Sequence, residues 1–194
     1  MPIKPFSARH TTDDLGDTLR INIPSQKQWF LILFMGFWLI GWAFGEVSAL
    51  GMFFGGQGFG GPGLFMIAWL GGWTIGGAWA IYILAWQLFG KEVIEITNQA
   101  IITKRVVFGL GFPNEYSFEY IKVLRVSVNV NTNDMFGWSR AGRLYGLSGR
   151  LIAFDYGSKT INFGSGIDEA EAKQILTEIT QRFPQYRGRN NQDL

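Results

Sequence analysis

The chain contains no cysteine and only one histidine. The absence of cysteine excludes disulfides, thiolate metal sites and thiol catalysis. Charge is also nearly absent between Gln28 and Gly90, where Glu46 is the only charged side chain. Because a solvated globular surface is rich in charged residues, this part of the chain is predicted to lie in an apolar environment.

Two apolar runs occupy this stretch, at residues 29–50 and 64–89. Each exceeds the roughly 20 residues that a helix needs to cross a hydrocarbon core about 30 Å thick. The sequence therefore predicts a transmembrane hairpin over residues 28–90. A cleaved signal peptide is the alternative for the first run. That run is longer than the roughly 7–15 apolar residues of a signal core, so we expect a retained anchor.

Lysine and arginine are missing from the connecting loop, residues 51–63, whereas Lys27, Lys91 and Lys104 lie on the other side of the two spans. Positively charged flanks of membrane spans remain in the cytoplasm. We therefore expect an integral protein of the cytoplasmic membrane with both termini in the cytoplasm.

Small residues recur at four-residue steps in both spans. The candidate helix-packing residues are Gly41 and Gly45 in the first span and Gly72 and Gly76 in the second. Rows of this kind let membrane helices approach closely. They would serve either to pack the two spans together, which the short loop favours, or to dock a second copy or another membrane protein.

Glu46 is an ionisable residue within a predicted span, which makes it a functional candidate. It lies about 26 Å along a helix that begins at Trp29, at about 1.5 Å per residue. That depth is near the far edge of the hydrocarbon core, so an interfacial carboxylate is favoured over a proton or ion relay. A polar contact with another subunit is the third interpretation.

The remaining residues predict a small, mainly antiparallel β domain, because apolar and polar residues alternate in short runs. The cytoplasmic leader, residues 1–27, has one such run near residues 18–23, and the domain proper covers residues 91–183. Residues 184–194 form a polar tail, and residues 131–149 a long loop. Further strands are predicted at residues 93–97, 100–108, 115–118, 121–130, 151–155 and 160–163.

Residues 168–183 predict an amphipathic helix that closes this domain. Asp168 and Glu171 have the spacing of a capping box at a helix start. Apolar residues then recur on one helical face, and Glu169 and Lys173 are spaced to pair on the other. The predicted class is thus a membrane protein with a two-helix hairpin, a β domain and one C-terminal helix.

A meandering antiparallel sheet closed by one C-terminal helix resembles a pleckstrin-homology-like domain. The stretches FWLIGWAFGE, FGKEVIEI, IAFDYG and INFGSGIDEAEAK are similar to a group of uncharacterised bacterial two-span membrane proteins with such a domain. The resemblance covers residues 19–183. It implies a fold and a location in the bacterial inner membrane, and no particular activity.

Catalytic patterns are weak in this sequence. The histidine, His10, lies in the polar leader and is expected to be solvated, and Asp155 precedes a turn without an evident partner. We find no nucleophile elbow, phosphate loop, metal-ligand spacing or carboxylate pair. Neither polar part has the concentrated basic footprint of a nucleic-acid binder. We expect no enzyme activity, no cofactor, no metal and no nucleic-acid partner.

Basic residues exceed acidic ones over residues 120–150, where Asp134 is the only acid, and Lys104 and Arg105 are expected to lie nearby. Near an anionic bilayer, each adds about 1 kcal/mol of attraction, so they form a candidate lipid-headgroup face; the alternative is an ordinary solvated rim. The candidate residues are Lys104, Arg105, Lys122, Arg125, Arg140, Arg143 and Arg150.

Two function classes follow. In the first, the protein is a non-enzymatic scaffold, accessory subunit or interaction module that acts through its pleckstrin-like domain. Its partners are then the bilayer and either another membrane protein or a second copy. In the alternative class, the basic face senses anionic lipid headgroups.

Overall fold

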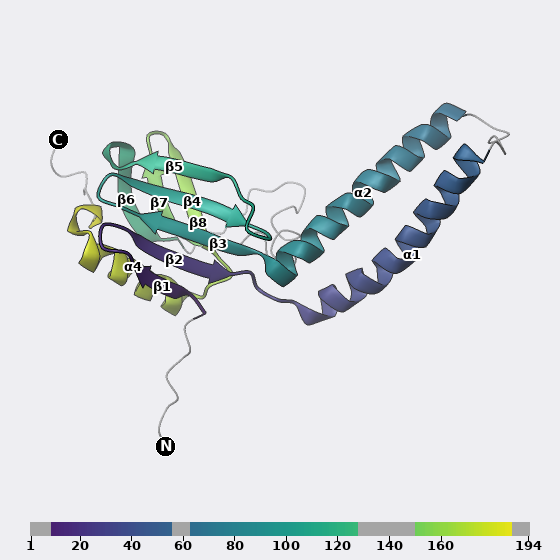
Figure 1. The fold of residues 1–194 in the computed structure, drawn as a ribbon. Coiled ribbons are helices and arrows are strands. Elements are labelled where there is room, and N and C mark those ends of the chain that lie inside the picture. The colour runs from purple at the N-terminus through teal and green to yellow at the C-terminus, as the bar shows by residue number, and fades with distance from the viewer. Residues whose placement is uncertain (1–8, 56–62, 128–149, 188–194) are drawn as a thin grey trace, which may run out of the picture. The chain divides into compact units, whose positions relative to one another are not determined.

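The computed structural model describes residues 9–55, 63–127 and 150–187. The chain divides into two compact units, which Figure 1 shows as a ribbon. Residues 27–88 form the first unit, which we call the helical hairpin. Residues 1–26 and 89–194 together form the second, which we call the β domain.

The helical hairpin consists of α1 (Trp29–Phe54) and α2 (Gly63–Phe89), close to the predicted spans. Both helices are long and apolar enough to cross a membrane. The outward side of α1 is a stripe of exposed aromatic and branched side chains, including Phe30, Phe37 and Phe44. A surface helix of a water-soluble protein carries polar residues on such a face.

The larger sheet of the β domain has five strands, each antiparallel to its neighbour. Four of them match predicted strands, and the exposed edge strand at the N-terminal end was not predicted. In their order across the sheet, the strands are β1 (Thr11–Asp14), β2 (Leu19–Pro24), β3 (Lys91–Ile96), β4 (Ala100–Val106) and β5 (Pro113–Ser117).

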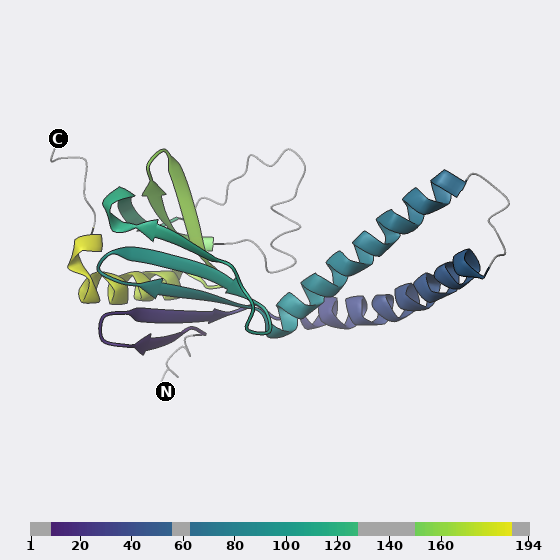
Figure 2. The same cartoon turned by 45° about the horizontal axis from the view of Figure 1, so that its top comes forward.

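The smaller sheet has three antiparallel strands in sequence order, and the C-terminal helix follows it, as Figure 2 shows from a second direction. Short 3-10 helices precede the sheet and follow the long helix. The elements are η1 (Phe118–Tyr120), β6 (Ile121–Val126), β7 (Arg150–Tyr156), β8 (Lys159–Ser165), α4 (Glu169–Arg182) and η2 (Pro184–Tyr186).

Strand β2 pairs with β3 although the whole helical hairpin lies between them in sequence. The ladder runs from Leu19 opposite Ile96 to Pro24 opposite Lys91, and the Ser25 amide donates to the Gly90 carbonyl at 2.9 Å. The division into a leader, residues 1–27, and a domain, residues 91–183, is therefore corrected. The leader supplies strands to the sheet, and the hairpin is an insertion within one domain.

The core of the β domain lies where both sheets and α4 meet. Alternate residues of β2 and β3, such as Ile21 and Ile94, are fully buried, as the period-two pattern predicts. Phe154 of β7 and Phe163 of β8 face them from the smaller sheet. The predicted apolar face of α4 is confirmed, since Ile175 and other residues of that face lie in the same cluster.

The predicted start of α4 is also confirmed. The Asp168 side chain accepts a hydrogen bond from the Glu171 amide at 2.8 Å. Glu169 and Lys173 form the expected ion pair at 2.7 Å. The carboxylate of Glu171 is used differently, in a contact that reaches the N-terminal segment.

Candidate functional site

The first two members of the predicted basic face lie on opposite faces of the larger sheet. Lys104 and Arg105 are consecutive residues of β4, and successive side chains of a strand alternate between faces. Lys104 Nζ lies 3.6 Å from Glu95 Oε1, which also accepts from Arg20 Nε at 3.0 Å. Arg105 is the register partner of the buried Glu92. One binding face cannot include both residues.

The next three members belong to the smaller sheet, and two of them are already engaged there. Arg125 donates to both carboxylate oxygens of Asp155, at 2.7 and 2.9 Å. Arg150 donates to the Asn162 carbonyl at 2.9 Å. Lys122 is exposed on β6. The expectation that Asp155 has no partner is therefore wrong, because β6 and β7 pair antiparallel.

This ion pair has an electrostatic consequence. The hydrogen bond from Arg125, together with one from Thr160 at 2.7 Å, holds the pKa of Asp155 below its usual value. The bond to Asp155 in turn raises the pKa of Arg125. Both groups therefore stay charged at neutral pH, and Asp155 neutralises much of the positive charge that Arg125 would offer to an anionic ligand.

Arg140 and Arg143 lie outside the described residues. The five described members of the basic face are thus divided between two sheets, and in the larger sheet between two faces. The single headgroup-binding face predicted from the sequence is corrected to this extent. The physical reason is that the pleat separates neighbours that a count of charges along the chain places together.

A buried carboxylate joins the two sheets at another point. Glu92 of β3 is 3% exposed. Its Oε2 accepts hydrogen bonds from the amide of Gly164 at 3.1 Å and from the amide and hydroxyl of Ser165, each at 2.7 Å. A buried acid must be fully paired, and this one is paired with the end of β8. The sequence does not indicate this contact, because the segment KEVIEI has the pattern of any half-buried strand.

His10 lies in a second buried contact of this kind. Its Nδ1 is 2.8 Å from Glu171 Oε1, which also accepts from the amides of Arg9 and His10 at 2.8 and 2.9 Å. Since a carboxylate only accepts, Nδ1 carries the proton. The expectation of a solvated histidine is therefore wrong. The contact joins the N-terminal segment to α4. These two segments are far apart in sequence, so no local pattern indicates the contact.

Within residues 9–55, 63–127 and 150–187, no three His, Asp or Glu side chains are grouped closely enough to hold a metal ion. The burial of Glu92, His10 and Glu171 is explained by the hydrogen bonds just described. These contacts stabilise the β domain, and each leaves the carboxylate surrounded by protein donors rather than open to a substrate.

In the helical hairpin, Glu46 of α1 contacts α2. The hydroxyl of Thr74 donates to Glu46 Oε1 at 2.6 Å, and the glutamate is 8% exposed. Its second oxygen, Oε2, is buried without a hydrogen-bond partner. Glu46 is thus a contact between the two helices. Its predicted depth at the membrane interface stays a prediction.

The predicted glycine rows do not mark the close approach of α1 and α2. A Cβ placed on Gly41, Gly45, Gly72 or Gly76 would meet no atom within 4 Å, apart from its own helix backbone and chain neighbours. At Gly77 it would lie 2.0 Å from Trp42 Cε2. Packing of the two helices through the four candidate glycines is therefore corrected to packing of an indole over Gly77.

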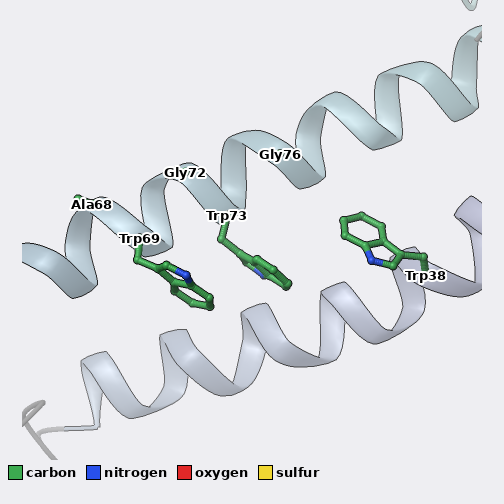
Figure 3. Close-up of a pocket in the computed structure, with 6 residues that line it drawn as sticks. All are labelled: Trp38, Ala68, Trp69, Gly72, Trp73 and Gly76. Atoms are coloured by element: carbon green, nitrogen blue, oxygen red, sulfur yellow. The ribbon is translucent and has the colours of Figure 1, made fainter. Parts of the chain in front are cut away.

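Three tryptophans lie beside Gly72 and Gly76 in the lining of a pocket of the hairpin. Figure 3 shows Trp69 and Trp73 extending from α2 toward α1, and Trp38 extending from α1. The rings of Trp69 and Trp73 stack with their centroids 5.2 Å apart, and the ring centroids of Trp38 and Trp73 are 6.3 Å apart. The three tryptophans, Ala68 and the two glycines line a pocket of about 420 Å³. Its lining has no ionisable group, so it offers an apolar space and no catalytic group.

Alanine at Gly77 is expected to weaken the packing of the hairpin by about 1–3 kcal/mol, because its methyl group would overlap the Trp42 indole. Alanine at Gly72, where the same group meets open space, is the matched control. Amide hydrogen exchange of α1 and α2 in detergent micelles measures the difference. Equal exchange in the two variants would contradict the assigned contact.

Comparisons of this chain with protein-family models, with curated proteins and with solved structures find no match. The class of protein is therefore inferred from the fold and the contacts alone.

Proposed function

We propose that the protein is an integral protein of the cytoplasmic membrane, anchored by α1 and α2, with both termini in the cytoplasm. The outward stripe of exposed aromatic and branched side chains on α1 carries this proposal. A continuous apolar surface of this length on a water-soluble protein would promote aggregation, whereas lipid tails solvate it. The length and composition of both helices support the same conclusion.

We further infer that the β domain is a pleckstrin-like, non-enzymatic interaction module, so that the protein acts as a scaffold or accessory subunit. The five-stranded and three-stranded antiparallel sheets with a C-terminal helix support the resemblance. The use of Glu92, Glu171 and His10 in structural hydrogen bonds supports a binding role over a catalytic one.

Lipid sensing by the basic face receives less support. Lys104 and Arg125 are in ion pairs with Glu95 and Asp155. Arg150 is bonded to a backbone carbonyl. These contacts would have to break before the side chains reached a headgroup. A protein partner or a second copy is therefore the favoured ligand of the domain.

The membrane topology is tested by cysteine labelling, which the cysteine-free chain makes straightforward. We expect Gln57→Cys, which lies between α1 and α2 in sequence, to react with a membrane-impermeant maleimide in intact cells. Ser158→Cys, in the turn between β7 and β8, should react only after the membrane has been permeabilised. Labelling of Ser158→Cys in intact cells would contradict the cytoplasmic orientation.

The binding role is tested by purifying the full chain in mild detergent and weighing the complex by native mass spectrometry. A stoichiometric second copy or protein partner is the expected result. A bare monomer would count against the scaffold. A retained anionic phospholipid that is lost when Lys122 and Arg150 are changed to alanine would favour lipid sensing instead.

A further inference from the structure

The most exposed apolar side chains of the β domain lie together in the turn between β4 and β5. Among the described large apolar residues of this domain, the three least covered are Phe108, Leu110 and Phe112, which are 66, 80 and 92% exposed. The flanking sequence, residues 106–114, has no charged residue. A cluster of this kind on an otherwise polar domain indicates a binding surface. We call these three residues the apolar tip.

The turn that carries the apolar tip has a defined shape. Val107 and Leu110 exchange backbone hydrogen bonds at 2.9 and 3.0 Å. The two central residues, Phe108 and Gly109, have φ angles of 52° and 83°. Both central residues of a type I′ turn have positive φ, which favours Asn-Gly, and phenylalanine at the first position is strained. The backbone conformation of the turn therefore gives no reason for an aromatic side chain at this position.

The apolar tip lies at the end of the sheet where the chain passes from α2 into β3. Lys91, the first residue of β3, is opposite Val106, the last residue of β4, so the turn extends beyond this end, as Figures 1 and 2 show. Phe89, the last residue of α2, is grouped with the β domain. The centroid of its ring lies 4.6 Å from the centroid of the Phe108 ring.

We propose that the apolar tip inserts into the interfacial region of the same bilayer leaflet that α2 leaves. This inference rests on the proposed membrane anchoring. If α2 spans the bilayer, Phe89 lies at the cytoplasmic interface, where aromatic rings are favoured, and the contact with Phe108 brings the turn to that depth. Lipid is the expected occupant because Phe108 contacts Phe89, the last residue of α2, and Lys91 beside the turn suits the headgroup layer.

Insertion would give the β domain a third attachment to the membrane, in addition to its two chain connections. The two connections leave the adjacent strands β2 and β3, at Ser25 and Gly90, and by themselves would let the domain tilt about this end of the sheet. A third point at the apolar tip restricts this tilt. The domain would therefore present one fixed side to its partners.

The test uses the full chain reconstituted in phosphatidylcholine vesicles, with and without phosphatidylglycerol. An environment-sensitive fluorophore is attached to Leu110→Cys, and its quenching by lipids with brominated acyl chains is measured. We expect a blue-shifted, strongly quenched signal in both kinds of vesicle, because the contact is apolar. Ser158→Cys, in a polar turn, is the control and should remain unquenched.

A label at Ile75→Cys, on the exposed face of α2, separates the two possible failures. Quenching at Ile75 without quenching at Leu110 would overturn the insertion of the apolar tip and leave the anchoring intact. Absence of quenching at Ile75 would overturn the anchoring itself, and the inference with it.

Because the fluorophore is itself apolar, a second variant tests the side chains directly. The label is moved to Asn114→Cys, and all three residues of the apolar tip are changed to serine. The core of the β domain should be unaffected, since none of these three side chains belongs to the buried cluster. We expect the quenching at Asn114 to fall to the level of the Ser158 control. Unchanged quenching would mean that the three side chains do not hold the turn at the membrane.

Discussion

Alanine at Glu92 is expected to lower the free energy of unfolding of the β domain by about 3 kcal/mol. The substitution leaves two backbone amides, of Gly164 and Ser165, and one hydroxyl buried without the acceptor they use in the native protein. Each buried donor without a partner costs about 1–3 kcal/mol, and relaxation or an entering water recovers part of the total. Since this carboxylate bridges the two sheets, both sheets should lose stability.

Hydrogen exchange of the full chain in detergent micelles, followed in peptides from β3 and β8, measures this effect. Glu115→Ala, on the exposed strand β5, is the matched control and should change stability by less than about 0.5 kcal/mol. Glu92→Gln keeps the volume and one acceptor oxygen, so an intermediate loss is expected. Equal protection of the β8 amides in Glu92→Ala and Glu115→Ala would show that the hydrogen bonds of Glu92 contribute little to stability.

Alanine at Phe154 is expected to lower the free energy of unfolding of the β domain by about 3–5 kcal/mol, which is more than alanine at Glu92. The ring is fully buried in β7 and meets Tyr116 of β5 edge-on at 5.2 Å and Phe163 of β8 at 6.0 Å. Its removal leaves a cavity where the two sheets face each other. Because a domain of this size has a total stability of about 5–15 kcal/mol, the substitution removes a large share of the stability of the β domain.

The control for this change is Phe112→Ala, which removes the same side chain from a position that is almost fully exposed. It should leave exchange of the core strands unchanged. Phe154→Leu, which leaves a smaller cavity and should therefore cost less than the alanine change, provides a graded measurement if the alanine variant does not accumulate. Equal protection in Phe154→Ala and Phe112→Ala would contradict the assignment of Phe154 to the core.

Local patterns predicted the elements well. The alternation at Leu19, Ile21 and Ile23 predicted a strand because one side of that strand is buried, and Asp168 marked the start of α4 because its side chain caps the helix. The partner of β2 could not be predicted, since the pairing spans residues 25–90 and no local pattern records a contact across such a distance. The edge strand β1 is fully exposed and therefore has no apolar alternation to detect.

The functional groups were harder to predict, for different reasons. His10 and Glu171 meet only after the N-terminal segment folds back onto α4. Gly77 is distinguished from Gly76 only by the position of Trp42, which depends on how the helices face each other. By contrast, the separation of Lys104 from Arg105 follows from strand alternation alone, and the sequence was sufficient to predict it.

The insertion of the hairpin between β2 and β3 has a consequence for synthesis. The ribosome completes β2 first and β3 only after both helices, so the sheet remains open until residues 25–90 have been made. With the helices inserted as proposed, β3 can reach β2 only when α2 has returned the chain to the side from which α1 departed. A chain with one helix left out of the bilayer would keep its central ladder unpaired. Closure of the sheet would therefore occur only in chains whose two helices are correctly inserted, and chains in which the sheet stays open would be exposed to proteolysis.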